Sequence, residues 1–227
     1  MVEDEREPVG GADGAPGAPG VAGQPEGWVD QRDVTDVAVL KALADPLRLA
    51  ILDALRRADG GPLTVKELAA ALGEPQTKLY RHIKQLEKAG LILVAGTRLV
   101  SGIVESRYSL AQRSIRLASD VFSEDSPARG DAYDAMLAGM DRVRDEFRAR
   151  IAEGRLDFSR PRDGSEGTPA LFADVPLRLS PERLIRLRNQ LGDIFDELNR
   201  EGPSEAEDAV EVTAFALLYG LRPGTDS

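Results

Sequence analysis

Residues 64–92 read TVKELAAALGEPQTKLYRHIKQLEKAGLI and contain the start and stop signals of two short helices. Thr64 and Glu67 have the spacing of a capping box, in which two side chains satisfy free N–H groups at a helix start. Gly73 is placed to end this first helix, and Pro75 suits the start of a second one. The stretch therefore predicts two helices joined by a tight turn, which is the outline of a helix-turn-helix motif.

The sequence on either side of this stretch extends the pattern. Upstream, Asp45 and Pro46 are residue types that suit a helix N-cap and first helical position. The other predicted elements are a helix over 34–44, β-rich runs at 91–96 and 102–110 joined by a loop at 97–101, and a helix over 111–122. Helices followed by a hairpin indicate a winged helix-turn-helix, so we expect a mainly α fold with a small β-hairpin over residues 31–122.

The second helix of the motif separates apolar from polar side chains. Leu79, Ile83 and Leu86 recur at spacings of four and three and must face the core. The outward positions gather at the start of the helix and hold Gln76, Thr77, Lys78, Arg81 and Lys84, with Tyr80 at the edge. Glutamine suits adenine, arginine or lysine suits guanine, and threonine can contact a thymine methyl or a phosphate. We therefore expect this helix to enter the major groove of double-stranded DNA.

Residues around this helix complete the set of candidates for DNA contact. Thr64 and Lys66, at the start of the preceding helix, are candidates for backbone phosphates, although a capping role is sufficient for Thr64. Arg98, on the predicted hairpin loop, is a candidate for phosphate or the minor groove. His82 is expected to be a partly buried packing residue rather than a phosphate contact or a pH sensor. Ordinary solvation of an exposed helix is the alternative explanation for the basic face.

Charge is divided unevenly along the chain. The protein has 227 residues and a formal net charge of -10. Residues 34–118 nevertheless hold thirteen basic and eight acidic side chains, a local charge of +5, and they include every lysine of the chain. Because binding to phosphates depends on the local potential, a basic block between acidic flanks favours a nucleic-acid partner.

Two segments beyond the central stretch add to a resemblance to a known family. They are VLKALADPLRLAILDAL, which precedes residues 64–92, and VESRYSL, which ends the predicted hairpin. Together, over residues 34–112, the chain resembles the ArsR-like family of bacterial winged helix-turn-helix transcription regulators. The resemblance implies a wing tip near Arg98 and DNA-facing positions at Gln76, Thr77, Lys78, Tyr80 and Arg81.

The resemblance also implies a homodimer, formed through the helices over 34–44 and 111–122. Metal sensors of this family carry cysteines on the helix before the turn, where this chain reads ELAAAL (67–72). Others use histidine and acidic pairs on the last helix, where this chain reads SIRLASD. The chain has no cysteine and one histidine. We therefore expect no metal site and no cofactor.

Two further regions flank the predicted winged helix-turn-helix. Residues 1–30 are rich in Gly, Ala, Pro and acid and are expected to form a disordered tail, with Trp28 as a local anchor. Residues 123–227 are expected to form a C-terminal α+β extension that adds dimer contacts or a pocket for a small-molecule effector. Its predicted elements are helices over 131–153 and 181–200, a loop over 154–168, and strands over 169–178 and 209–221. The apolar stripe over 184–198 is either a dimer seam or a helix-on-sheet core.

The composition and the missing motifs exclude several function classes. The lack of cysteine excludes disulfides and thiolate metal sites, and the chain has no P-loop, no GxGxxG after a strand and no GxSxG. No apolar run approaches the roughly 20 residues that span a bilayer, and MVEDEREPVGG lacks the features of a secretory signal.

We therefore expect a cytoplasmic, nucleoid-associated protein without enzymatic activity. The expected function is sequence-specific regulation of transcription, by a dimeric repressor rather than an activator. A winged-helix module for protein contacts, without specific DNA binding, is the alternative.

Overall fold

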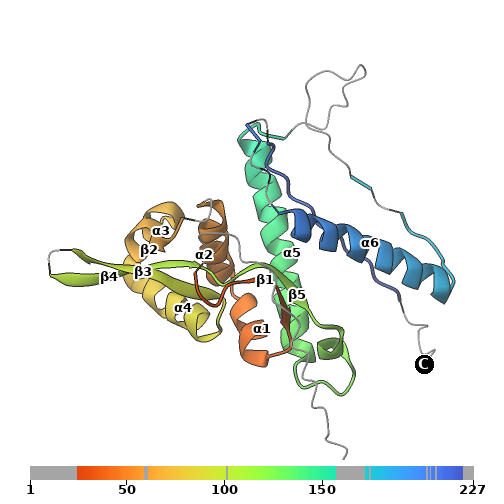
Figure 1. Cartoon of the computed structure of the whole chain (residues 1–227). Helices are drawn as coiled ribbons and strands as arrows, with labels where there is room; N and C mark the ends of the chain where they lie inside the picture. Colours follow the sequence, from red (N-terminus) through yellow and green to blue (C-terminus); the bar gives the residue numbers. More distant parts are fainter. Residues whose placement is uncertain are drawn as a thin grey trace, which may run out of the picture.

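Helices surround a small core, with a long hairpin projecting from it and two longer helices from the C-terminal half beside it (Figure 1). The computed structural model describes residues 25–58, 61–100, 102–156, 172–173, 175–202, 204, 206–207 and 209–221. Residues 1–24 of the expected disordered tail therefore lie outside the described residues. In chain order the elements are β1 Val29–Val34, α1 Val37–Leu43, α2 Pro46–Arg57, β2 Leu63–Thr64, α3 Val65–Leu72, α4 Gln76–Lys88, β3 Ile92–Val100, β4 Ile103–Leu110, β5 Gln112–Leu117, the 3-10 helix η1 Ser119–Phe122, α5 Arg129–Ala152 and α6 Pro181–Glu201.

The helices of the helix-turn-helix begin and end at the signals in the sequence. Asp45 caps α2, because its Oδ1 accepts a hydrogen bond from the Arg48 N–H at 2.9 Å. Gly73 ends α3 with a φ of 65°, a left-handed conformation that favours glycine. Pro75 stands just before α4. The predicted fold class, a winged helix-turn-helix with a C-terminal extension, is confirmed.

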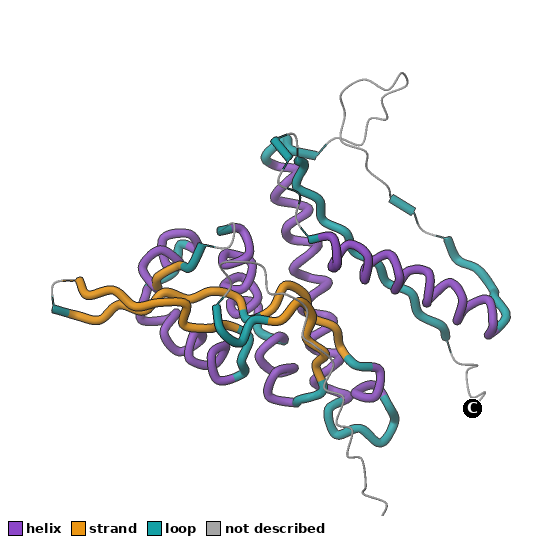
Figure 2. Tube along the Cα trace, viewed as in Figure 1, coloured by secondary structure: helices purple, strands orange, loops and turns teal. Residues whose placement is uncertain are grey.

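The hairpin is longer and its turn tighter than predicted (Figure 2). β3 and β4 pair in antiparallel fashion from Ile92 opposite Leu110 to Val100 opposite Ile103, and β2 adds a short third strand beside β4. The predicted loop at 97–101 is wrong, since residues 97–100 continue the strand. The turn includes Gly102 at a φ of 79°, which lets the chain reverse within a short distance.

The predicted helix over 111–122 is also wrong. Residues 112–117 form β5, which pairs in parallel with β1, and only Ser119–Phe122 turns into a 3-10 helix. The buried Gln112 side chain donates to the Leu91 carbonyl at 3.0 Å and ties this strand to the residue directly before β3. On the exposed side, Arg116 bonds Asp33 across the two strands at 2.8 and 3.0 Å. The family-derived dimer helix at this position therefore does not exist.

The core lies among α1 to α4 and the base of the hairpin. Its fully buried side chains include Leu40, Ile51, Leu68, Leu79, Ile83, Leu86, Leu91 and Ile92. The start of α5 joins this core, because the helix packs along α1 and its Ala132 and Ala135 are buried. The small alanines let the two helices approach closely. The first helix after residue 123 is thus packed onto the winged helix-turn-helix.

The C-terminal extension is helical in its described part, and the two strands predicted there are wrong. Residues 172–173, 175–178 and 209–221 have no regular secondary structure, while the rest of the predicted strand over 169–178 and residues 157–168 of the predicted loop lie outside the described residues. α6 forms as predicted but buries none of its side chains. No helix in the part of the chain that the structure describes is both long enough and apolar enough to cross a membrane.

Candidate nucleic-acid interface

α4 exposes its polar side and buries its apolar side. Leu79, Ile83 and Leu86 are at most 1% exposed and pack into the core. The exposed residues on the first turns are Gln76, Thr77, Lys78, Tyr80, Arg81 and Lys84. The structure therefore brings these predicted contact residues together on one helix.

The start of α4 leaves backbone N–H groups open to solvent. Pro75 is the N-cap residue and no side chain caps the helix. The amides of Lys78 and Leu79 donate to the Pro75 carbonyl at 3.0 and 3.3 Å, whereas those of Gln76 and Thr77 have no acceptor among the described residues. Free N–H groups and the positive end of the helix dipole attract an anion such as a phosphate.

The basic side chains of this surface differ in how far their charge is compensated. Lys78 Nζ lies 2.8 Å from Glu74 Oε1, so this lysine is already paired with a residue of the turn that precedes α4. Within the described ranges, Arg81, Lys84 and Lys66 make no ion pair. Arg81 and Lys84 therefore present uncompensated positive charge on the first turns of α4, as Lys88 does at its C-terminal end.

Arg98 lies inside β3 and not on a loop. It stands opposite Glu105 of β4, and its Nε donates to Glu105 Oε2 at 2.6 Å. This cross-strand pair stabilises the hairpin and compensates the arginine charge. The turn near Gly102, and not Arg98, forms the end of the wing.

The wing, α3 and α4 meet around a small cleft. Its volume is about 110 Å³, and its walls include Lys66 of α3, Gln76 and Tyr80 of α4, and Glu105 and Tyr108 of β4. Tyr80 is 53% exposed and stands at the rim. Lys66 and the first turns of α4 thus share one face with the base of the wing.

Among the predicted contact residues, Thr64 is buried and does not belong to the exposed surface. Its side chain is fully buried, and its hydroxyl donates to Glu67 Oε2 at 2.8 Å and accepts from the Glu67 N–H at 3.2 Å. Glu67 Oε2 also accepts from the Thr64 N–H at 2.7 Å, which completes the capping box. These bonds from the Thr64 backbone and hydroxyl hold the pKa of Glu67 below its usual value.

Replacing Thr64 with valine should lower the free energy of unfolding by about 1 kcal/mol at pH 7, because the cap is lost. A carboxyl whose pKa is lowered by folding stabilises the protein above its unfolded pKa, and this contribution disappears as the pH falls through the folded pKa. The difference between wild type and Thr64→Val should therefore shrink below about pH 4. Urea unfolding across this pH range measures it. Thr64→Ser, which keeps the hydroxyl, should retain the wild-type pH dependence, and a pH-independent gap would contradict the prediction.

A network that sequence reasoning missed holds α4 against α2. Arg48 donates from its guanidinium to the carbonyls of Ala42 and Lys41 at 2.8 and 2.6 Å, and to Gln85 Oε1 of α4 at 2.6 Å. An arginine on a helix is usually solvated, so the sequence offered no signal for this role.

His82 occupies the same junction. It is half-buried, and its Nδ1 lies 3.4 Å from Asp45 Oδ1 without making a hydrogen bond. The expectation of a packing residue is consistent with this position, which is on the core side of α4.

A helix-turn-helix with an exposed polar second helix, followed by an antiparallel hairpin, defines the class of winged helix-turn-helix DNA-binding proteins. A family model described as a helix-turn-helix domain matches residues 43–95. The chain is also similar to the HTH-type transcriptional regulator NmtR of Mycobacterium tuberculosis, with 39% identity over 86 residues that cover 37% of this chain and 68% of that protein. The chain belongs to the ArsR-like family of winged helix-turn-helix transcription regulators.

Proposed function

We propose that the protein is a dimeric, sequence-specific transcriptional repressor whose α4 reads the major groove of double-stranded DNA. The observation that carries the proposal is the exposed start of α4, where uncompensated Arg81 and Lys84 lie beside Gln76 and the free N–H groups of the helix. Lys66 and the wing of β3 and β4 flank it and contact the DNA backbone. The protein acts in the cytoplasm, at the nucleoid, and has no enzymatic activity.

The contacts on α4 divide into base-reading and phosphate-binding groups. Gln76 and Arg81 reach base edges, because amide and guanidinium groups match the pattern of adenine and guanine. Thr77, Lys78, Lys84 and the free amides contact phosphates and fix the register of the helix. Tyr80 packs at the rim of this surface. Thr64 is left out because its hydroxyl is buried.

The C-terminal extension supplies the dimer interface. Its exposed large apolar residues include Phe147 and Ile151 of α5, Ile185, Ile194 and Leu198 of α6, and Val212, Phe215 and Tyr219 beyond α6. A soluble monomer rarely exposes so many large apolar side chains in one region, which supports a second copy as the partner. Since no described segment of the extension is a strand, nothing supports a helix-on-sheet core for the 184–198 stripe, and the dimer seam is the better interpretation. Two copies would place their α4 helices in half-sites roughly 34 Å apart.

Arg81→Ala tests the reading role of α4. We expect this variant to bind the promoter of its own operon about tenfold to one hundredfold more weakly, because one guanidinium contact to guanine is lost. Affinity for unrelated DNA should change far less, and wild-type affinity should fall steeply with salt. Fluorescence anisotropy with both DNA fragments, over a series of salt concentrations, measures these effects.

Lys88→Ala is the matched control, since it removes one positive charge from the far end of the same helix. An equal loss in both variants would show that only net charge matters. Full activity after joint neutralisation of Lys78, Arg81 and Lys84 would favour a protein-contact module instead.

A further inference from the structure

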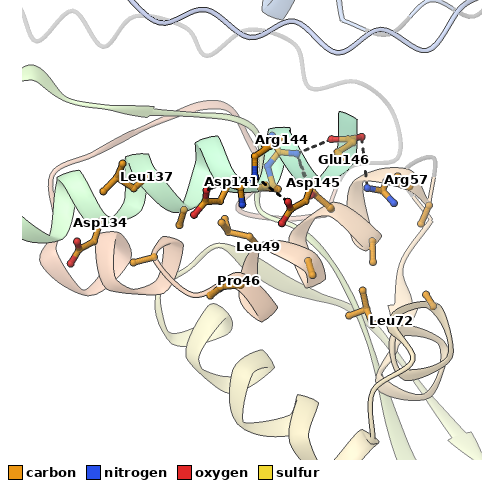
Figure 3. Close-up of a pocket in the computed structure, with 18 of the residues that line it drawn as sticks. Pro46, Leu49, Arg57, Leu72, Asp134, Leu137, Asp141, Arg144, Asp145 and Glu146 are labelled. Carbon is orange, nitrogen blue, oxygen red and sulfur yellow. Dashed lines mark hydrogen bonds and ion pairs between the residues drawn. The ribbon is translucent and has the colours of Figure 1, made fainter. Parts of the chain in front are cut away.

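A cavity lies between the helix-turn-helix and α5 (Figure 3). Its volume is about 870 Å³, within the range of about 300–1,000 Å³ that is usual for small-molecule sites. Its walls come from α2, α3 and α5. The cavity thus touches both the DNA-binding domain and the first helix of the extension.

The walls are apolar and built around small side chains. Ala50 and Ala54 of α2 and Ala138 of α5 leave the space open, while Leu72 of α3 and Leu137 of α5 supply larger apolar surfaces. An apolar body of moderate size therefore fits between the helices with favourable burial.

The charged side chains that the structure describes at the rim are paired, with one exception. Five of the lining residues are acidic and three are arginines, and arginines outside the lining add to the pairing, since Arg56 lies 2.7 Å from Asp53, Arg150 lies 3.8 Å from Glu146 and Arg148 lies 3.9 Å from Asp145. The arginines are already paired. Arg57 lies 3.7 Å from Glu146, Arg142 lies 3.2 Å from the buried Asp53, and Arg144 lies 2.9 Å from Asp141.

Asp134 differs from the other acids of the rim. It stands on α5 at the opposite end of the cavity from Glu146 and Arg57 (Figure 3). It makes no ion pair or side-chain hydrogen bond with any residue that the structure describes. Its carboxylate is therefore available to a cation that enters at this end.

We propose that this cavity binds a small organic cation, with its apolar body against Leu49 and Leu137 and its ammonium group near Asp134. The apolar walls account for the body, and the unpaired carboxylate of Asp134 selects a positive head over a negative one. Binding itself does not depend on the proposed function. A regulatory effect of that binding does depend on it, because a ligand held between α2 and α5 would couple the position of the extension to the DNA-binding surface.

Three probes that share one apolar body test the charge preference: 4-phenylbutylamine, 4-phenylbutan-1-ol and 4-phenylbutyrate. Isothermal titration calorimetry with the full chain should show that the amine binds about tenfold more tightly than the carboxylate, with the alcohol between them. Equal binding of the three, or no binding of the amine, would overturn the proposal.

Two substitutions locate the site. Asp134→Asn should weaken amine binding about two- to fivefold, in line with a partly exposed ion pair. Asp193→Asn, an equal change on α6, should leave it unchanged. Ala138→Phe should fill the cavity and remove binding of every probe, and thermal unfolding with circular dichroism should confirm that this variant is folded. Unchanged amine binding in Ala138→Phe or Asp134→Asn would place the probe elsewhere and overturn the assignment.

DNA binding without any probe separates the two proposals. Amine binding with no specific DNA binding would contradict the proposed function and support the cavity site. Specific DNA binding with no amine binding would support the proposed function and contradict the cavity site. Sedimentation velocity of Ala138→Phe adds a third outcome, since dissociation of a wild-type dimer by this change would show that a second copy fills the cavity and would overturn the ligand site.

Discussion

Substituting Arg48 with methionine is expected to lower the free energy of unfolding by about 2–3 kcal/mol, because its charged hydrogen bonds are lost together. The Arg48 side chain is only 13% exposed, and its guanidinium joins two carbonyls at the end of α1 to Gln85 on α4. Methionine fills similar space but donates no hydrogen bond. The carbonyls of Ala42 and Lys41 would then lose their charged donor, and α4 would lose a tether in its C-terminal half.

Urea unfolding, followed by circular dichroism, measures this effect at neutral pH. Arg148→Met on α5 is the control, since Arg148 is 70% exposed and its ion pair is long at 3.9 Å. That change should alter stability by less than about 0.5 kcal/mol. Equal unfolding midpoints for the two variants would show that the Arg48 network contributes nothing. DNA binding by folded Arg48→Met should also weaken, because Arg48 holds α4, the proposed recognition helix, in place.

Placing glutamate at both Ile194 and Leu198 is expected to dissociate the proposed dimer. These side chains are 52% and 50% exposed in the single chain and stand one helical turn apart on α6. Two buried carboxylates facing a second copy would be desolvated without partners. Affinity for DNA with two half-sites should fall about one hundredfold or more, since each α4 would then bind alone.

Sedimentation velocity and anisotropy with one-site and two-site DNA measure this loss. The control is the pair Arg186→Gln and Gln190→Glu, which changes the net charge by the same amount at exposed positions of the same helix. It should remain dimeric. Affinity for a single half-site should be equal in both double variants, and a dimeric Ile194→Glu, Leu198→Glu protein would contradict the proposed interface.

The parts of the fold that sequence patterns predicted correctly are those that short-range chemistry determines. Asp45, Thr64 and Gly73 act within a few residues of themselves, so the starts and ends of α2, α3 and α4 could be predicted. The side of α4 that faces the core could be predicted from the spacing of Leu79, Ile83 and Leu86. The compensation of the Arg98 charge could not be predicted, because Glu105 pairs with Arg98 only once β4 lies beside β3.

The incorrect predictions share a different cause. Residues 112–117 become a strand because β1 lies beside them, and no local pattern reveals a partner so distant in the chain. Residues 209–221 are rich in β-branched and aromatic side chains, but a strand needs a neighbour for its backbone hydrogen bonds, and the described chain provides none there. The Arg48 network was missed for the same reason, since its acceptors lie on other helices.

The parallel pairing of β1 with β5 also affects the order in which the protein assembles during synthesis. Asp33 and Arg116, which pair across these strands, are 83 positions apart. Contacts between residues so distant form late, whereas helices and their near neighbours form early. On the ribosome, α2 to α4 can fold as they emerge, but β1 has no partner until residues 112–117 have left the exit tunnel. A nascent chain stopped before that point would hold a folded α4 beside an unpaired strand edge, which is a site for aggregation.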